Sequence, residues 1–351
     1  MKQTILYGGL RALDSELKNV ADARYTILLD ENTFQHCLPL LISEVEPLQE
    51  AEFIEVPAGE ECKSLEVAAQ VWQTLLEGEA DRKHIIVNLG GGSVCDLGGF
   101  VAAGYKRGIR YINVPTTLLA MVDAAIGGKT AIDFGGIKNS IGHFYPAEMT
   151  VIDRSFLESL PQVELTCGLM EMVKTAAVTD PALYDRLLSA DRLSSALING
   201  VVRIKARVVK ADPYDNGIRK ILNFGHTFGH AIEAYTAMLP ADNGRFLPIP
   251  HGIAVGIGMR YAMYLSTKKV GLSEEVYRSY TQWLGIQLSA SGFQVPVFNL
   301  KEIEQMLRLM HQDKKNAEGC LRCVLLQELG APVIDANIDD NEVRDAMLQR
   351  Y

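Results

Sequence analysis

The sequence predicts an α/β domain at the N-terminus followed by an all-α domain at the C-terminus. Three observations lead to this fold class: the length of the chain, continuous apolar runs in its first part, and long helical repeats in its second. At 351 residues the chain is long enough for two domains, each with its own core. Hydrophobic residues make up 48% and charged residues 22%, which is typical of a globular protein and not of a disordered one.

Short apolar runs in the first part of the chain predict strands. "YTILLD" (25–30), "HIIVNLG" (84–90) and "YINVPT" (111–116) each end at polar or glycine residues. An amphipathic stretch over 64–80 predicts a helix between two of them. Because apolar residues do not alternate with polar ones, these strands should be buried on both faces, which indicates a parallel sheet covered by helices. Ligands of such sheets bind beyond the carboxyl ends of the strands.

Helical patterns dominate after about residue 155. Two short stretches, 322–329 and 331–335, still have strand character. We therefore predict an α/β domain over residues 1–155 and a helical domain over 156–351. The helices are expected over 162–178, 194–211, 224–237, 252–269, 273–284, 299–311 and 339–349.

Charge and composition exclude several classes of partner. The formal net charge of −9 argues against a general role on nucleic acids or membrane surfaces. No stretch offers about 18 apolar residues, as a transmembrane helix would need, and the N-terminus meets charged residues too early for a signal peptide. Six scattered cysteines, including a CxxC at 320 and 323 that we interpret as a coincidence in a strand, are typical of reduced thiols. We expect a cytoplasmic protein.

Glycine-rich turns at predicted strand ends favour a dinucleotide site. "LGGGSVCDLGGF" (89–100) follows a strand and opens a helix, and "VPTTLLAMVDAAIGGKT" (114–130) supplies a second such loop. The spacing is not GxGxxG, and tight packing would explain the glycines nearly as well. Asp30 ends a third strand, where its carboxylate could bind ribose hydroxyls or form a salt-bridged turn. Together the three strand ends favour a Rossmann-like domain.

The stretch "NFGHTFGHAIE" (223–233) is a candidate source of metal ligands. His226 and His230 are four residues apart and share one helix face, and Glu233 continues that line. The stretch lacks the glutamate of HExxH, so a third ligand must come from elsewhere. Glu171 lies in a mostly apolar helix and His251 follows two prolines at a helix start. Glu171, His251 and one of the paired histidines would complete a Glu-His-His site.

Each of these residues also has a structural interpretation. Glu171 and Lys174 could form an ordinary ion pair on a helix surface, and a lone histidine such as His251 is more often structural than a ligand. Basic residues nevertheless recur in the same polar turns of an acidic chain, which indicates a substrate with phosphate, carboxylate or both. They are Arg107, Lys129, Lys138, Lys174, Lys205, Arg219, Lys314 and Lys315.

Taken in order, these motifs resemble the 3-dehydroquinate synthase family, the sugar phosphate cyclases of the shikimate pathway. The resemblance covers about residues 30–315 and rests on an ordered series. The series is "GEECKS" (59–64), "GGGSVCDLGGF", "YKRG", "VPTTLLAMVDAAIGGKT", "KNSIGHFYP", "GLMEMVK", "LNFGHTFGHAIEA", "HGIAVGIGM" and "DKKN".

The resemblance implies a Rossmann-like N-terminal domain, an all-α C-terminal domain, bound NAD+, one Zn2+ or Co2+, and a homodimer. It implies an enzyme that converts 3-deoxy-D-arabino-heptulosonate 7-phosphate (DAHP) into 3-dehydroquinate and phosphate. The reaction passes through transient oxidation by NAD+, β-elimination of phosphate, reduction, and intramolecular aldol closure.

The resemblance also implies site residues at matching positions. The metal ligands fall on Glu171, His226 and His251, while His230 faces the substrate and assists proton transfer. The contacts to NAD+ fall on Asp30, Asn32, Glu60, Lys63, Gly91, Gly92, Asp96, Thr116, Thr117, Asp123 and Lys138. The substrate contacts fall on Arg107, Lys129, Asn139, Lys174, Lys205, Arg219, Asn223, Lys314 and Lys315.

The sequence departs from the family pattern at positions beside the predicted site. Ile253 stands where a Glu is common, which removes a possible second partner for the metal site. Asp133 occupies a position where Asn is common. The remaining departures are Ile137 in place of a glycine, Pro213 after Asp212 where an acidic residue is frequent, and Asp215 where Glu is expected.

Three other functions stay open on the sequence. One is a different sugar phosphate cyclase, acting for example on sedoheptulose 7-phosphate or glucose 6-phosphate. Another is a metal-dependent polyol dehydrogenase on the same fold, which would release NADH. The last is a catalytically silent NAD-binding protein, and the intact set of Glu171, Lys174, His226 and His251 argues against it.

Overall fold

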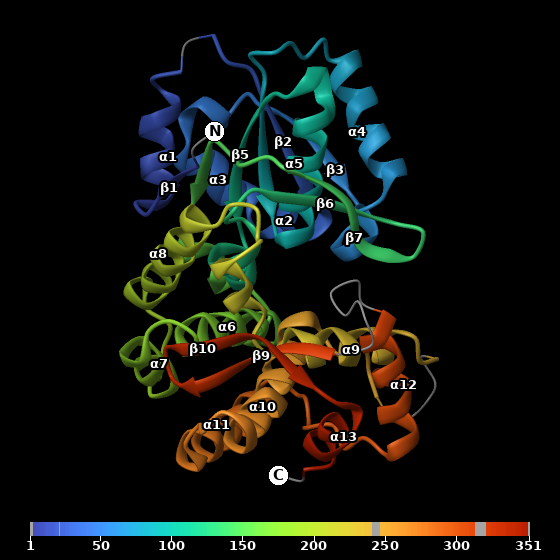
Figure 1. Ribbon diagram of the computed structural model, residues 1–351. Coiled ribbons are helices and arrows are strands. Elements are labelled where there is room, and N and C mark those ends of the chain that lie inside the picture. The colour runs from blue at the N-terminus through green and yellow to red at the C-terminus, as the bar shows by residue number, and fades with distance from the viewer. Residues whose placement is uncertain (1–2, 21, 241–245, 313–320, 350–351) are drawn as a thin grey trace. The chain divides into compact units, whose positions relative to one another are not determined.

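The computed structural model describes residues 3–20, 22–240, 246–312 and 321–349, and Figure 1 shows their secondary structure. The chain divides into two compact units, Met1–Pro161 and Gln162–Tyr351. The sequence placed this boundary between residues 155 and 156. Lys314 and Lys315 lie outside the described residues.

A six-stranded parallel sheet forms the centre of the first unit (Figure 1). The strand order is β1-β8-β5-β4-β2-β3, and every neighbouring pair runs parallel. All residues of β2 and β4 are buried, as their continuous apolar runs predict. The three predicted strands are confirmed within one residue at each end. The strands are β1 (Thr4–Leu6), β2 (Tyr25–Asp30), β3 (Glu52–Val56), β4 (Ile85–Gly90), β5 (Arg110–Pro115) and β8 (Met149–Val151).

Helices connect these strands, and α4 and α5 bury apolar residues against the sheet. Val71 of α4 and Leu97 of α5 share one buried cluster with Leu28 and Ile86 of the sheet. The helix predicted over 64–80 is confirmed as α4. The α-helices are α1 (Gly9–Leu17), α2 (Glu31–His36), α3 (Leu38–Glu44), α4 (Leu65–Glu77) and α5 (Gly92–Gly104), and the short turns are η1 (Glu46–Leu48), η2 (Gly59–Cys62), η3 (Tyr105–Arg107), η4 (Ala120–Ala124) and η5 (Arg154–Glu158).

An antiparallel hairpin of β6 (Lys129–Phe134) and β7 (Ile137–Phe144) forms a separate sheet in this unit. All eight residues of β7 are exposed. The sequence did not predict these strands, because Ile137, Ile141 and Phe144 stand on an exposed ribbon and not in a core.

The second unit is mostly helical, and its only strands among the described residues are the antiparallel pair β9 (Leu321–Glu328) and β10 (Ala331–Ile338). The seven predicted helices and the two predicted strands are confirmed. The helices are α6 (Gln162–Ala177), α7 (Pro181–Leu188), α8 (Ser195–Ala211), η6 (Ile218–Asn223), α9 (His226–Ala237), α10 (His251–Lys269), α11 (Glu274–Ala290), α12 (Leu300–Gln312) and α13 (Asp340–Leu348).

Helix α10 is the buried centre of the second unit, and its glycines bring two other helices close. A Cβ atom on Gly252 would lie 2.4 Å from the carbonyl oxygen of Cys167 in α6. A Cβ atom on Gly258 would lie 2.1 Å from the carbonyl oxygen of Gly225, just before α9. Only glycine permits such backbone approach. The helices that carry Glu171 and His226 are therefore held against α10. No helix among the described residues is long and apolar enough to cross a membrane.

Candidate active site

Three neighbouring strand ends bring together predicted nucleotide residues in the first unit. Strands β5, β4 and β2 are adjacent and end at Pro115, Gly90 and Asp30. The N–H of Thr116 donates to the carbonyl of Gly90 at 2.9 Å, so the loops that follow β5 and β4 are joined where they leave the sheet. This edge is where parallel sheets bind ligands.

Asp30 caps a helix at this edge. Its Oδ1 accepts the N–H of Thr33 at 2.9 Å, and the Asp30 N–H donates back to the Thr33 hydroxyl at 2.9 Å, which forms a capping box. The capping hydrogen bonds reach Oδ1, whereas Oδ2 accepts none from the part of the chain described. The structural role of Asp30 is therefore that of a helix cap, and not the salt-bridged turn that the sequence analysis considered. Its Oδ2 stays available for a ligand.

The glycine-rich turn after β4 is tightly packed and opens α5. A Cβ atom on Gly90 would lie 2.5 Å from that of Val94, and one on Gly91 would lie 3.2 Å from Cγ2 of Thr117. Gly91 caps α5, which begins at Gly92 and runs for 13 residues. Packing explains why Gly90 has no side chain. The N-terminal N–H groups of α5 lie at the same strand end and are suited to an anion.

A buried lysine organises the charged groups of this unit. Lys63 is 3% exposed, and its Nζ donates to Oδ2 of Asp96 at 2.8 Å and, through a short contact, to Oδ1 of Asn139. Burial raises the pKa of Asp96 to about 6 although the Lys63 ammonium opposes this. Ser93 Oγ donates to Glu60 at 2.7 Å, and the Lys138 ammonium lies 3.5 Å from the same carboxylate. The structure therefore places Glu60, Lys63, Asp96, Lys138 and Asn139 in one neighbourhood.

Other predicted residues of the first unit lie on α2, η3, η4 and β6 and in the loop after β5. Asn32 is exposed on α2. No described contact joins Asn32 or Arg107 to the cluster around Lys63. Arg107 has a φ of 65° and follows Lys106 at 47°, so two side chains project from a left-handed turn. Thr117 accepts the N–H of Ala120 at 3.1 Å. Asp123 lies within η4 and Lys129 begins β6.

Glu171 and Lys174 form a buried ion pair in α6, each 1% exposed. The interpretation as an ordinary pair on a helix surface is therefore wrong. Burial raises the pKa of Glu171, but Lys174 and His251 outweigh burial and hold the pKa well below its usual range. Lys174 faces Oε2. Oε1 is buried and accepts no hydrogen bond from the described residues, which is costly unless a cation lies beside it.

Two imidazoles point at this unsatisfied oxygen. Nε2 of His251 lies 3.6 Å from Oε1 of Glu171, and Nε2 of His226 lies 3.9 Å from it. Ligands about 2.1 Å from a tetrahedral zinc ion lie about 3.4 Å from one another, so the spacing of these donor atoms fits one ion. Burial lowers the pKa of His226 well below its ordinary value, which keeps the ring in the neutral form that binds metal.

His230 belongs to the same cluster. One ring nitrogen from each of His226, His230 and His251 lies within 4.8 Å of the others. The rings of His226 and His230 meet edge to face with centroids 5.2 Å apart. A set of three imidazoles could therefore hold a metal as well, and the geometry does not by itself assign separate roles to Glu171 and His230.

Glu233 fixes the orientation of His251, a role that the sequence analysis did not assign. Its Oε2 lies 2.8 Å from Nδ1 of His251. With Nδ1 held in this way, Nε2 is the atom turned toward Glu171. Burial lowers the pKa of His251, but Glu171 and Glu233 outweigh burial and raise it to about 10. The signal was present, because Glu233 continues the line of the two histidines on α9. Ile253 is buried, and it is Glu233 that supplies the carboxylate partner.

Besides Lys174 on α6, the described substrate residues predicted in the second unit lie on α8 and η6. Lys205 and Arg219 are each 5% exposed. Asp212 caps the turn before η6, because its carboxylate accepts the N–H of Gly217 at 2.6 Å and of Arg219 at 3.1 Å. Asn223 ends η6, three residues before His226. The departure at Pro213 leaves this turn intact, and the carbonyl of Pro213 accepts a hydrogen bond from the Arg219 guanidinium at 2.9 Å.

Comparison with known proteins shows the family. Residues 53–167 match the model of the 3-dehydroquinate synthase N-terminal domain, and residues 168–316 match that of its C-terminal domain. A 3-dehydroquinate synthase of Parabacteroides distasonis is 35% identical over 345 residues, which are 95% of this chain and 94% of the relative. The chain belongs to the 3-dehydroquinate synthase family.

Solved structures share the fold of this 3-dehydroquinate synthase family member. ValA, the 2-epi-5-epi-valiolone synthase of Streptomyces hygroscopicus subsp. jinggangensis 5008 with NAD+ and Zn2+ bound, has a TM-score of 0.84 and 24% identity over 99% of this chain and 95% of its own. A 2-deoxy-scyllo-inosose synthase complexed with carbaglucose-6-phosphate, NAD+ and Co2+ has a TM-score of 0.80 and 22% identity over 99% and 96%. The predicted fold class is confirmed.

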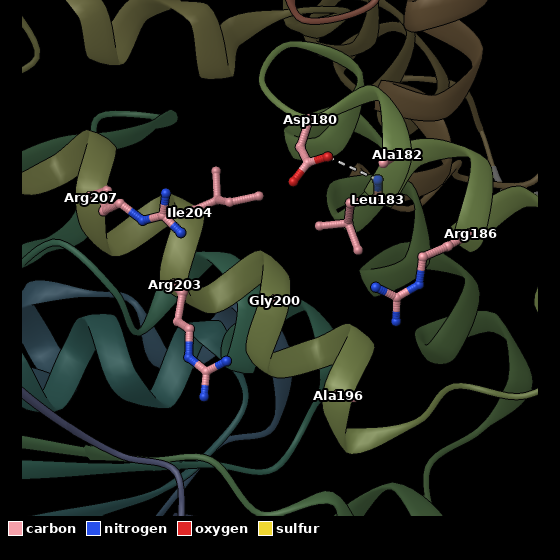
Figure 2. Close-up of a pocket in the computed structure, with 9 residues that line it drawn as sticks. All are labelled: Asp180, Ala182, Leu183, Arg186, Ala196, Gly200, Arg203, Ile204 and Arg207. Carbon is pink, nitrogen blue, oxygen red and sulfur yellow. Dashed lines mark hydrogen bonds between the residues drawn. The ribbon is translucent and has the colours of Figure 1, made fainter.

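A separate cavity of about 210 Å³ lies between α7 and α8 (Figure 2). It contains none of the residues that the family resemblance assigns. Asp180 at its edge caps α7 by accepting the N–H of Leu183 at 3.0 Å. Three exposed arginines line it, namely Arg186, Arg203 and Arg207.

Proposed function

We propose that this protein is a 3-dehydroquinate synthase, a lyase that converts DAHP into 3-dehydroquinate and phosphate with NAD+ and Zn2+ or Co2+. The observation that carries the proposal is the buried Oε1 of Glu171, which faces Nε2 of both His226 and His251 in a member of this family. We further propose that the protein works as a homodimer in the cytoplasm, as the family resemblance implies.

Each cofactor has donors suited to it within one unit. Glu171, His226 and His251 would hold the ion, and the strand ends of the first unit would hold NAD+. Bound NAD+ would supply a hydride acceptor for C5, and a bound ion would supply positive charge beside the C5 oxygen. The residues proposed for NAD+ are Asp30, Asn32, Glu60, Lys63, Gly91, Gly92, Asp96, Thr116, Thr117, Asp123 and Lys138.

The remaining residues bind and orient an anionic sugar. His230 is proposed to move a proton beside the metal site, because its ring lies against those of His226 and His251. Held cations fix the phosphate so that the departing group can itself take the adjacent proton, and no strong base is needed there. The proposed substrate residues are Arg107, Lys129, Asn139, Lys174, Lys205, Arg219, Asn223, Lys314 and Lys315.

One assay tests this function against its rivals. The metal-loaded protein is given DAHP with NAD+ far below the substrate concentration, and phosphate, the carbocyclic product and NADH are followed together. We expect phosphate and product in equal amounts with no net NADH. Phosphate from sedoheptulose 7-phosphate or glucose 6-phosphate, but not from DAHP, would indicate another cyclase. Net NADH from glycerol would indicate a dehydrogenase, and no turnover of any of these would overturn the proposal.

A further inference from the structure

The β6–β7 hairpin contains a β-bulge in β7, opposite Asp133. The pairing is Ile132 with Ile141 but then Phe134 with Ile137, so Asp133 of β6 stands opposite the three residues 138–140 of β7, and the extra residues of the bulge belong to β7. The Asp133 carboxylate accepts the backbone N–H of Asn139 at 2.7 Å. Asn139 has a φ of 53°, in the left-handed region that few residues other than glycine adopt. The Asp133 side chain therefore holds the backbone of Asn139 in this conformation.

A second contact holds the side chain of Asn139. The buried Lys63 ammonium donates both to Oδ1 of Asn139 and to Oδ2 of Asp96. An ammonium group can only donate, so the atom of Asn139 that faces it must be the carbonyl oxygen. The Nδ2 group therefore faces the other way. The N–H of Asp133 also donates to the carbonyl of Lys63 at 2.7 Å, which joins the hairpin to the lysine.

We propose that Asp133 and Lys63 are positioning residues that present the Nδ2 donors of Asn139 to an acceptor oxygen of an anionic sugar. The inference rests on the proposed function, since that function assigns Asn139 to the substrate. An amide held at its backbone N–H and at its oxygen has few rotamers left to lose when the substrate binds. Bulges beside active sites commonly re-aim a side chain in this way.

The test compares D133A with D133N, N139A and the double variant D133A/N139A. The D133A variant removes the acceptor, and we expect kcat/KM for DAHP to fall about tenfold, the loss of one hydrogen bond to a charged group. The affinity for NAD+ should stay unchanged, since Lys63 keeps its contact with Asp96. An amide oxygen can replace the carboxylate as acceptor, so D133N should retain most of the activity. If the bulge merely shaped the hairpin, D133A would not lower kcat/KM while leaving the affinity for NAD+ unchanged, and D133N would not differ from D133A.

The double variant shows whether Asp133 acts through Asn139. In the N139A background, D133A should cost less than about twofold, because its partner is already absent. An equal loss in both backgrounds, or normal kcat/KM in D133A, would overturn the inference.

Amide hydrogen exchange separates this inference from the proposed function, because it requires no turnover. The Asn139 amide should exchange faster in D133A than in the unaltered protein or D133N, and equal exchange in all three would refute the positioning contact. If the unaltered protein releases no phosphate from DAHP while D133A still speeds exchange, the proposed function fails and the positioning geometry stands.

Discussion

The two units satisfy their buried charges in different ways. In the first unit the Lys63 ammonium binds Asp96 and Asn139, so the protein itself supplies the partners of this buried charge. In the second unit Lys174 covers only one oxygen of Glu171, and the other is buried without a hydrogen bond from the described residues. A buried carboxylate oxygen is costly unless a cation meets it. The comparison supports the proposal that a cation from outside the chain lies beside Oε1 of Glu171, where it would displace a proton from the His251 imidazole.

The units also differ in what holds their site residues. In the first unit they stand at strand ends, in loops and on a hairpin, where backbone conformation decides their direction. In the second unit His226 and His251 are the first residues of α9 and α10, and these helices are packed too closely to admit a Cβ atom at Gly258. Rigid helices fix ligand positions more accurately than loops do. We therefore expect substitutions in the two units to respond differently to metal.

The largest effect is expected for H251A, which removes one of the two imidazoles facing Glu171. Turnover of DAHP should fall about 1,000-fold or more, because several kcal/mol of charge stabilisation would be lost with the ion. The affinity for NAD+ should stay unchanged, since its proposed residues lie in the other unit. Steady-state kinetics, zinc content and NAD+ titration would measure this, with H311A as a histidine control elsewhere in the unit. Normal turnover in H251A would refute the ligand assignment.

A smaller effect is expected for K174M, which leaves Glu171 buried without its ammonium partner. Breaking a buried ion pair from one side costs about 3 to 5 kcal/mol of unfolding free energy. Zn2+ would replace the missing positive charge, so the unfolding free energy should fall more in the presence of chelator than in excess zinc. Chemical denaturation under both conditions would measure it.

The K63M variant sharpens this comparison in the first unit. It also breaks a buried pair, but within the described parts of the chain Asp96 belongs to no cluster that could hold a metal. The loss of unfolding free energy should therefore be the same with zinc and with chelator. The exposed pair of Lys268 and Glu274 provides a surface control, and K268M should cost less than about 0.5 kcal/mol. Equal zinc responses of K174M and K63M would contradict the difference between the two units.

Elements with strong hydrophobic patterns could be predicted from the sequence. Strands β2, β4 and β5 are continuous apolar runs because they are buried on both faces. The β6–β7 hairpin could not be predicted, since its exposed ribbon follows no burial pattern. Periodicity also could not show that Glu171 and Lys174 are buried, because the spacing of three residues is the same in an ion pair on a helix surface and in a buried one.

The residues that the structure gathers around Glu171 could be predicted from the sequence, but not their separate roles. His226 and His230 share one helix face, so spacing alone cannot say which binds metal, and the structure keeps both near His251. The separate roles came from the family resemblance. Contacts between distant residues left weaker signals. No sequence pattern predicts the bulge that joins Asp133 to Asn139. The sequence did place Glu233 on the helix face of the two histidines, but it did not indicate that His251 is its partner.

The smallest effect is expected for E233A, which removes the carboxylate bound to Nδ1 of His251. The ring would lose its fixed orientation and Nε2 would no longer be aimed at Glu171, while all the metal donors stay in place. Loss of such a partner typically weakens metal affinity about 10- to 100-fold, which competition with a chelator would measure. In E233Q an amide oxygen can still accept from Nδ1–H, so its affinity should lie between those of E233A and the unaltered protein. The matched control is E274A, which removes an exposed carboxylate of the same unit and should bind metal normally. If E233A bound zinc as tightly as E274A, the packing of α10 alone would suffice to aim His251, and the carboxylate would have no part in building the metal centre.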